Sequence, residues 1–339
     1  MRRFFDVLLS LALLTAIGYG GYYIAARGTA IDPEVSYEPV TEETTEDPNQ
    51  IRFTTQEIQN QEIYNGSLIL VNHENAFQGN EDDIVSLYQV MLEKDCHSFG
   101  VRDADVKVRQ ANADALINLF NAFYNETYDN NISVQSGYRS RERQQELYDE
   151  DLAKTGLDYS ERVSVPGHSE HQTGWCVDLD LVGQDYDGTG IYSYIDEHCF
   201  EYGLILRYPE NKTEITQISY ESWHYRYVGR PHAFYIMHHD LCLEEYIGLL
   251  YKYPYDGEHL EITDFDGEIY EVYYYPAELS ADVTQLSVPE NREFTISGNN
   301  RDGFIVTVDT GETGEIPQDV TEETESSEEA ETTADENQQ

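Results

Sequence analysis

The sequence predicts an α+β fold, in which a small antiparallel sheet with flanking helices is followed by a small all-β module. Between residues 61 and 254, short apolar strands alternate with segments of helical periodicity. From residue 255 to about residue 310, short alternating segments follow one another with turn signals between them. The hydrophobic content of 40% is sufficient for a core in a chain of this length.

The first 27 residues combine a basic start with a long apolar run. Arg2 and Arg3 precede a run from Phe4 to Ala26, about the 20 residues that a membrane-spanning helix needs. Basic residues before such a run predict a cytoplasmic N-terminus. The pattern therefore favours a single-pass anchor in the cell membrane, with everything after Arg27 exported. A cleaved signal peptide, which would make the protein secreted, is the alternative.

Two acidic segments flank the part that is expected to fold. Residues 28–60 and residues 311–339 are rich in Glu, Asp and Thr, and the second segment contains no Lys or Arg. Both lack the apolar side chains that would offset the entropy of ordering them, so they predict a disordered linker and a disordered tail. The formal net charge of −46 at pH 7 also excludes nucleic acid as a partner, because phosphate binding needs a basic face.

The elements expected between residues 61 and 254 follow from apolar periodicity and from turn and cap residues. They are a buried strand at 66–72, a helix at 113–128, a strand and turn at 132–140, a charged surface helix at 141–154, a helical stretch ending at 203, strands in "LILRYP" and "SWHYRYVG", and helices starting at 231 and 243.

The expected β module begins near residue 255. Its strands lie in "HLEIT", "EIYEVYYY", "REFTIS" and "DGFIVTV", with hairpin turns at Asp266-Gly267 and Asp302-Gly303. The module has no concentration of catalytic residue types, which favours an accessory role in packing or wall contact. The four cysteines, at positions 96, 176, 199 and 242, match no zinc-ribbon spacing and are expected to be small buried thiols.

One stretch contains residue types that could bind a metal ion. In "PGHSEHQTGWCVDLDL", residues 166–181, apolar residues alternate with Cys176, Asp178 and Asp180, so Asp178 lies on the opposite side of a strand from its apolar neighbours. His171 lies just before the tight Thr173-Gly174 turn, which would bring it back beside Asp178. These two residues offer nitrogen and oxygen ligands for a metal ion.

A second stretch completes the set of residue types. "SYESWHYRYVG", residues 219–229, contains Glu221 and His224 three positions apart. Positions three apart on a regular strand face opposite sides, so Glu221 must lie in the turn before the strand if both are to reach one site. His171, Asp178 and His224 would then supply the three protein ligands of a catalytic zinc site, with Glu221 as a carboxylate base beside them.

Four motifs in order carry a family resemblance. "SGYRS" with Gln144 after it, "PGHSEHQTGWCVDL", "YGLILRYP" and "ESWHYRYVG" resemble the VanY-type D-alanyl-D-alanine carboxypeptidases, which are zinc metallopeptidases related to D-Ala-D-Ala dipeptidases. The resemblance covers roughly residues 64–251. It implies His171, Asp178 and His224 as Zn²⁺ ligands and Glu221 as the catalytic base. Cys176 is a departure, because the family often has Ala there.

The resemblance also implies roles for three polar residues. Arg139 matches an arginine that steadies the developing oxyanion, and Ser169 and Gln144 match positions near the substrate. Each has an ordinary alternative: an ion-pair partner for Arg139, a turn hydroxyl for Ser169 and a surface helix residue for Gln144.

The implied function is removal of the terminal D-Ala from peptidoglycan stem peptides outside the membrane. An L,D-carboxypeptidase acting on tetrapeptide stems is an alternative, because these metal motifs do not separate the two activities. A non-catalytic cell-wall-binding module is an alternative of another class, although such a module has no need of Glu221.

Overall fold

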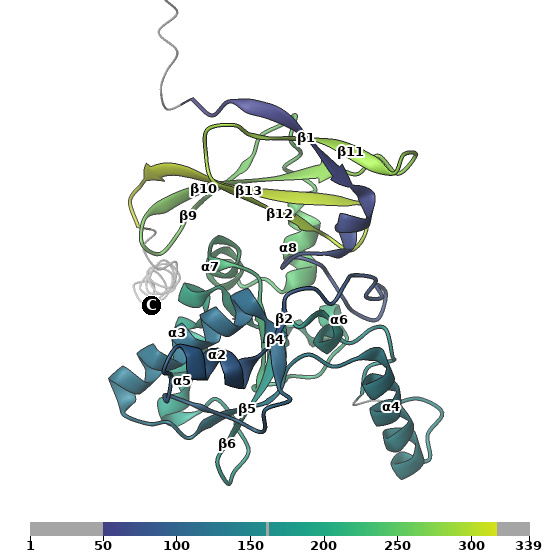
Figure 1. Ribbon diagram of the computed structural model, residues 1–339, viewed down its shortest axis with the longest axis vertical. Helices are drawn as coiled ribbons and strands as arrows, with labels where there is room; N and C mark the ends of the chain where they lie inside the picture. Colours follow the sequence, from purple (N-terminus) through teal and green to yellow (C-terminus); the bar gives the residue numbers. More distant parts are fainter. Residues whose placement is uncertain (1–49, 161–162, 317–339) are drawn as a thin grey trace, which may run out of the picture. The chain divides into compact units, whose positions relative to one another are not determined.

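The computed structural model describes residues 50–160 and 163–316 (Figure 1). The predicted anchor at residues 1–27 lies outside the described residues, and so do most of the two acidic segments. Within the described part of the chain, no helix is both long enough and apolar enough to span a bilayer.

A five-stranded sheet forms the centre of the part before residue 255. Its order is β3-β5-β6-β8-β7, and all neighbouring pairs are antiparallel except β3 and β5, which are parallel. The predicted antiparallel sheet is therefore confirmed, apart from one edge pair. The strands are β3 (Gly100–Val101), β5 (Ile132–Ser136), β6 (Cys176–Leu181), β7 (Leu204–Leu206) and β8 (His224–Tyr227).

One face of this sheet packs on α3 (Gln110–Thr127) and α2 (Leu87–Glu93). Val177 and Tyr225 are partners across β6 and β8, and both belong to the apolar core with Phe120 and Phe123 of α3. Their direct neighbours in sequence, Asp178 and His224, face the other side, because side chains alternate along a strand. The alternation of side chains that was predicted from the sequence therefore puts core residues on one face of the sheet and the candidate site residues on the other.

The remaining helices largely match the sequence pattern. Helix α4 (Arg141–Thr155) is the charged surface helix, and its N-cap Ser140 accepts a hydrogen bond from the Arg143 amide. Helix α7 (Arg230–His238) has a proline in its first turn. The others are α5 (Ser193–His198), α6 (Thr213–Thr216), α8 (Leu243–Leu250) and the 3₁₀ turns η1 (Asn60–Tyr64), η2 (Glu170–Thr173), η3 (Gly190–Tyr192), η4 (Cys199–Tyr202) and η5 (Glu210–Lys212).

The C-terminal part is a four-stranded antiparallel sheet of order β12-β13-β10-β9. Its members are β9 (Leu260–Thr263), β10 (Glu268–Pro276), β12 (Phe294–Gly298) and β13 (Gly303–Thr313). Both predicted hairpins are present, and Gly267 has the positive φ of 86° that its turn needs. This sheet shares an apolar core with α7 and α8, including Tyr246 and Ile262, so the two predicted domains pack together (Figure 1).

Two further strand pairs complete the described elements. β2 (Ile84–Ser86) pairs with β4 (Lys107–Arg109), and β1 (Phe53–Gln59) pairs antiparallel with β11 (Val283–Pro289). The pairing of β1 corrects one prediction, because residues 53–59 were assigned to the disordered linker. Likewise β13 runs to Thr313, past the predicted start of the tail at residue 311.

The predicted strand at residues 66–72 is wrong, although the segment is buried. Leu68 and Leu70 are at most 1% exposed, yet no strand forms there. The backbone is satisfied by side chains instead, because the Leu68 amide donates to Ser297 Oγ and Asn300 Nδ2 donates to the Leu70 carbonyl. The four cysteines are buried free thiols, as predicted.

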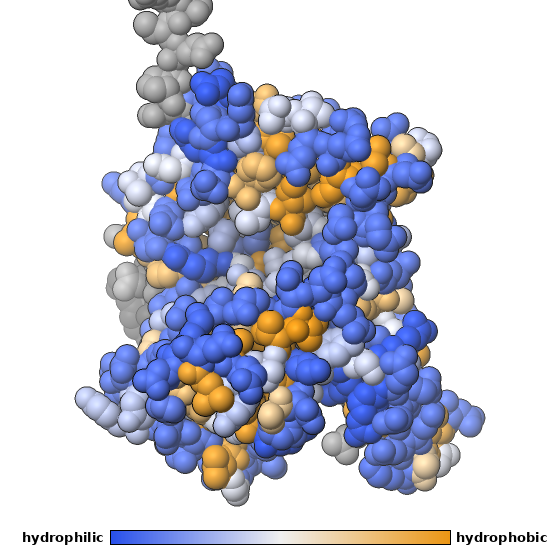
Figure 2. All heavy atoms as spheres, in the orientation of Figure 1, coloured by the Kyte–Doolittle hydropathy of each residue, from blue (hydrophilic) through white to orange (hydrophobic). Residues whose placement is uncertain are grey.

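The surface agrees with the strongly acidic composition. Figure 2 shows a face that is mostly hydrophilic, with hydrophobic side chains gathered in separate patches. Large apolar side chains that remain exposed include Tyr128, Val182 and Leu279, which belong to different parts of the fold.

Candidate active site

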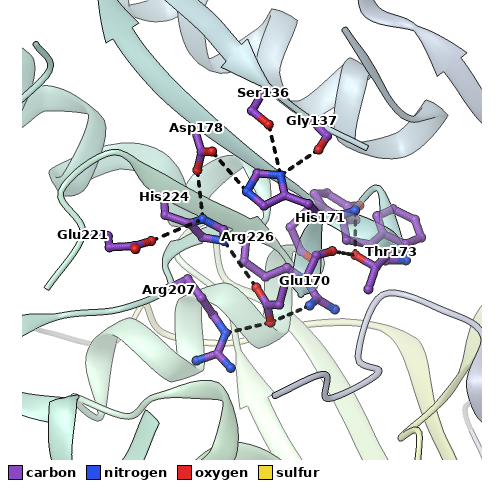
Figure 3. Close-up of polar contacts among 12 residues, drawn as sticks. Ser136, Gly137, Glu170, His171, Thr173, Asp178, Arg207, Glu221, His224 and Arg226 are labelled. Carbon is purple, nitrogen blue, oxygen red and sulfur yellow. Dashed lines mark hydrogen bonds and ion pairs between the residues drawn. The ribbon is translucent and has the colours of Figure 1, made fainter. Parts of the chain in front are cut away.

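Strand register brings two of the predicted ligands together. Asp178 on β6 is the direct cross-strand partner of His224 on β8, and Ser136 on β5 is its partner on the other side. His224 Nδ1 lies 2.9 Å from Asp178 Oδ1 (Figure 3). Antiparallel partners project from the same face of a sheet, so this register fixes both side chains on the face opposite the α3 core.

A tight turn brings His171 to the same place, as predicted. His171 lies in η2, which ends at Gly174 with a φ of 72°, and a Cβ there would meet Ile84 Cδ1 at 2.4 Å. The ring nitrogen Nε2 of His171 lies 3.1 Å from Asp178 Oδ2. The other nitrogen, Nδ1, lies 2.7 Å from the Gly137 carbonyl, to which it donates (Figure 3). This bond leaves Nε2 free to act as a ligand atom.

Glu221 lies in the turn that precedes β8, where the sequence argument required it. The His224 amide donates to the Glu221 carbonyl across this turn, and Glu221 Oε2 is 3.6 Å from His224 Nδ1. Burial raises the pKa of the Glu221 carboxyl, although His224 acts in the opposite direction. A carboxylate whose pKa is raised accepts a proton more readily, which is what a general base requires.

Arg139 is the cation nearest to this group of side chains. Its guanidinium donates to Ser136 Oγ at 3.0 Å and to Gln144 Oε1 at 2.8 Å, and it lies 4.0 Å from Asp178 Oδ2. Gln144 is 1% exposed, and its Nε2 donates to the Ser164 carbonyl. Both polar ends of the Gln144 side chain are therefore engaged within the protein, an arrangement that holds Arg139 in place.

Comparison with known proteins identifies relatives of this arrangement. The model of the VanY family, described as D-alanyl-D-alanine carboxypeptidase, matches residues 105–230. A D-alanyl-D-alanine carboxypeptidase of Enterococcus faecium is 32% identical over 323 residues, which cover 92% of this chain and 98% of the relative. The chain belongs to the VanY family.

Other relatives differ in how much of the chain they cover. The bifunctional D-Ala-D-Ala dipeptidase and D-Ala-D-Ala carboxypeptidase VanXYC of Enterococcus gallinarum is 41% identical over 127 residues, 35% of this chain and 67% of the relative. The solved structure of the vancomycin-resistance D,D-dipeptidase VanXYg, in complex with a D-Ala-D-Ala phosphinate analogue, superposes with a TM-score of 0.67 at 34% identity. That alignment covers 76% of this chain and 99% of the other. The likeness to this solved structure therefore extends well beyond residues 105–230, which the family model matches.

The donor set fits a zinc ion. Two imidazole nitrogens and a carboxylate converge, and such donors are those of three-ligand catalytic zinc sites. Burial acts to raise the pKa of Asp178, but His171 and His224 outweigh it and hold that pKa well below its usual range. For His171, burial acts to lower the pKa, yet Asp178 raises it to about 9. With these opposite pKa shifts, the ionised carboxylate of Asp178 lies between two basic side chains, those of His171 and His224.

Cys176 also reaches this site. Ligand atoms of His171, Cys176 and His224 all lie within 4.8 Å of one another. Burial acts to raise the pKa of the Cys176 thiol, but the two histidines outweigh it and lower the pKa to about 7. From the sequence, Cys176 was a departure from the family pattern and was not among the expected ligands. It stands as a second candidate for the position given to Asp178.

Side chains near His171 hold the loop that leads to it. Ser169 is 4% exposed at the N-cap of η2, one turn from the group of ligands. Gln172 Oε1 accepts a hydrogen bond from the Gly167 amide at 2.7 Å. His168 has Nδ1 2.8 Å from the Asn72 carbonyl. The loop is thus fixed by groups that are not ligands.

Sequence reasoning missed a buried charge cluster behind the site. Glu170 Oε1 accepts hydrogen bonds from Arg207 Nε and Arg226 Nη1, both at 2.8 Å (Figure 3). Both arginines are fully buried. The available signal was the single arginine inside each of two otherwise apolar or aromatic strand segments, "LILRYP" and "WHYRYVG", because a charge buried in a sheet needs a partner.

Proposed function

We propose that this protein is a zinc-dependent D-alanyl-D-alanine carboxypeptidase, which removes the terminal D-Ala from peptidoglycan stem peptides. The observation that carries the proposal is the convergence of His171, Asp178 and His224 on one sheet face with Glu221 beside them. Membership of the VanY family supports the same reaction class.

His171 through Nε2, His224 through Nδ1 and the Asp178 carboxylate would hold the ion. A bound zinc ion supplies Lewis-acid polarisation and lowers the pKa of a water ligand from near 16 to about 7. Glu221 accepts the proton of the attacking water and passes it to the leaving amine of D-Ala. Its place in the turn, close to His224 Nδ1 but outside the cross-strand pair, suits a base and not a ligand.

Arg139 stabilises the negative charge that develops on the scissile carbonyl oxygen. Burial lowers the pKa of the Arg139 guanidinium and Asp178 raises it, but the group stays charged at neutral pH because arginine titrates far above this range. A fixed cation in a poorly hydrated site acts most strongly on charge that appears only in the transition state. Gln144 supports this function by holding Arg139.

The C-terminal carboxylate of the substrate needs hydrogen-bond donors. Ser169 and backbone amides of the loop that leads into η2 would supply them, since a hydroxyl donates one hydrogen bond and each non-proline amide one more. This role would account for a serine at a nearly buried N-cap.

The reaction takes place outside the cell in this proposal. The apolar run from Phe4 to Ala26, after two arginines, acts as a single-pass membrane anchor with an exported catalytic part. Protease added to intact cells without their wall should then digest peptides between residues 139 and 224. Protection of those peptides, with digestion only after lysis, would contradict the export.

Mass spectrometry of defined substrates tests the reaction. The purified full-length chain, loaded with zinc, is incubated with a pentapeptide stem, a tetrapeptide stem and free D-Ala-D-Ala. Release of the last D-Ala from the pentapeptide should exceed release from the other two. Faster cleavage of the tetrapeptide would indicate an L,D-carboxypeptidase, and binding of muropeptides without cleavage would indicate a wall-binding module.

A further inference from the structure

The side of His224 away from the site faces a buried carboxylate. His224 Nδ1 points to Asp178, whereas Nε2 lies 3.5 Å from Glu170 Oε2. Both of these atoms are buried and neither has another hydrogen-bond partner among the described residues. Two buried polar atoms that face each other without other partners are arranged to satisfy each other.

Glu170 has one oxygen left for this purpose. Its Oε1 already accepts from Arg207 and Arg226, so only Oε2 remains to accept a hydrogen bond. With two guanidinium groups at 2.8 Å, Glu170 is placed as a charged acceptor, which makes hydrogen bonds about twice as strong as a neutral acceptor does.

The arginines are held in turn by groups outside the site. Arg207 makes a two-point contact with Glu244 of α8, at 2.9 and 2.7 Å. Arg226 Nη2 donates to the carbonyls of Ser67 and Ile69. Because both arginines are fixed at their other ends, the position of Glu170 is set by the surrounding fold and not by His224.

We propose that Glu170 is a positioning residue for the zinc site: it accepts the Nε2 proton of His224, so that the lone pair of Nδ1 points to the metal. This inference rests on the proposed function, because it requires zinc at His224. Histidines that bind metals commonly donate their other ring N–H to a carboxylate or carbonyl, which fixes the ring and makes it a stronger ligand. His171 has such a contact with the Gly137 carbonyl, and Glu170 supplies the equivalent for His224.

Zinc affinity of the metal-free protein tests the proposal without depending on turnover. Affinity is measured by competition with a chromophoric chelator for the wild type, Glu170→Gln and Glu245→Gln. Glu170→Gln should raise the zinc dissociation constant about 10-fold or more, as for other partners of metal-binding histidines. Glu245→Gln is the control, because it changes a carboxylate on the same helix that contacts Cys242 and Lys212 and not the cluster around Glu170. Its zinc affinity should stay close to that of the wild type.

Nuclear magnetic resonance of the zinc-loaded wild type keeps the proposal testable if Glu170→Gln does not fold. With histidine labelled with ¹⁵N, the His224 ring should carry its proton on Nε2, in slow exchange with solvent, and bind the metal through Nδ1. A proton on Nδ1 would overturn the proposal, and so would equal loss of affinity in both variants or unchanged affinity in Glu170→Gln. A wild type that binds no zinc would instead contradict the proposed function itself.

Discussion

Asp178 and His224 face each other across adjacent antiparallel strands, with His224 Nδ1 2.9 Å from Asp178 Oδ1. His171 approaches the other oxygen of the same carboxylate from the turn before β6. The site is therefore built from two regular strands and one short turn, which keeps its ligand atoms at fixed separations. Ligands on rigid elements hold a metal geometry more closely than ligands on long loops.

A catalytic base is needed for turnover but not for zinc binding, whereas a metal ligand is needed for both. Glu221→Ala should keep about one zinc ion per chain but lose at least roughly 100-fold in kcat, which is a typical contribution of general base catalysis. Metal content by elemental analysis and D-Ala release are measured on the same samples. Near wild-type turnover in this variant would refute Glu221 as the base.

Removing a metal ligand should abolish zinc binding and turnover together. His171→Ala should lose zinc and turnover, and a chelator should have the same effect on the wild type, with activity restored when zinc is added back. His198→Ala is the control, since this histidine lies outside the site and contacts Glu201. Full activity of the wild type after complete removal of metal would exclude a zinc mechanism.

Cys176 and Asp178 are competing candidates for the third ligand, and substitution distinguishes them. If Asp178 is the ligand, Cys176→Ala should retain zinc and most activity, because a small apolar side chain fits a fully buried position. Asp178→Ala should lose zinc. The reverse pattern in elemental analysis would assign the metal to the His171, Cys176 and His224 set.

Gln144 should affect turnover through Arg139. Gln144→Ala removes the hydrogen bond at Arg139 Nη1, so kcat should fall about 10-fold while zinc content stays unchanged, because a hydrogen bond to a charged group contributes about 1.5–3 kcal/mol. Gln145→Ala on the same helix is the control, since Gln145 is exposed and bonds only Asp149 among the contacts of its side-chain amide in the described chain. A rise in KM with unchanged kcat would instead assign Gln144 to substrate binding.

His232 should make stability sensitive to acid. Burial lowers its pKa to about 3, and its ring contacts Tyr246 Oη at 2.7 Å and Thr307 Oγ1 at 2.9 Å. The unfolded chain takes up this proton near pH 6.5 and the folded chain only near pH 3, so the stabilisation is complete above pH 6.5 and is lost as the pH falls toward 3.

Between pH 6.5 and pH 5 the wild type should therefore lose about 2 kcal/mol more unfolding free energy than His232→Gln, at about 1.4 kcal/mol per pH unit. Urea unfolding in the presence of a chelator measures this loss without a contribution from zinc release. The control is His97→Gln, an exposed histidine, which should follow the wild type. Parallel pH profiles for the wild type and His232→Gln would contradict the assignment.

Part of the candidate site was predictable because its geometry is local. Alternation along residues 175–181 and the Gly174 turn place His171 beside Asp178, and the three-residue spacing required Glu221 to lie in a turn. The apolar face of the helix at 113–128 likewise predicted α3. In each case, residues that act together are close in sequence or follow one periodicity.

The errors arise where contacts are distant in sequence. In β1 most side chains are exposed, so no apolar alternation marks it, and it is a strand only because β11 pairs with it. Residues 66–72 have the apolar sequence of a strand, but the side chains of Arg226 and Asn300 donate hydrogen bonds to backbone carbonyls of this segment. Glu170 could not be assigned without knowing that Arg207 and Arg226 meet behind it.

The pairing of β1 with β11 has a consequence for how the chain folds during synthesis. Glu57 and Gln285, which contact each other across this pair, are 228 residues apart in sequence. In the described part of the chain, β1 is the first strand to emerge and must wait for β11, and contacts between such distant residues slow folding because a long loop must close first. Until β11 arrives, β1 exposes an unpaired strand edge, which is open to pairing with another chain. The charged Glu57 on this edge discourages such pairing while the rest of the protein is being made.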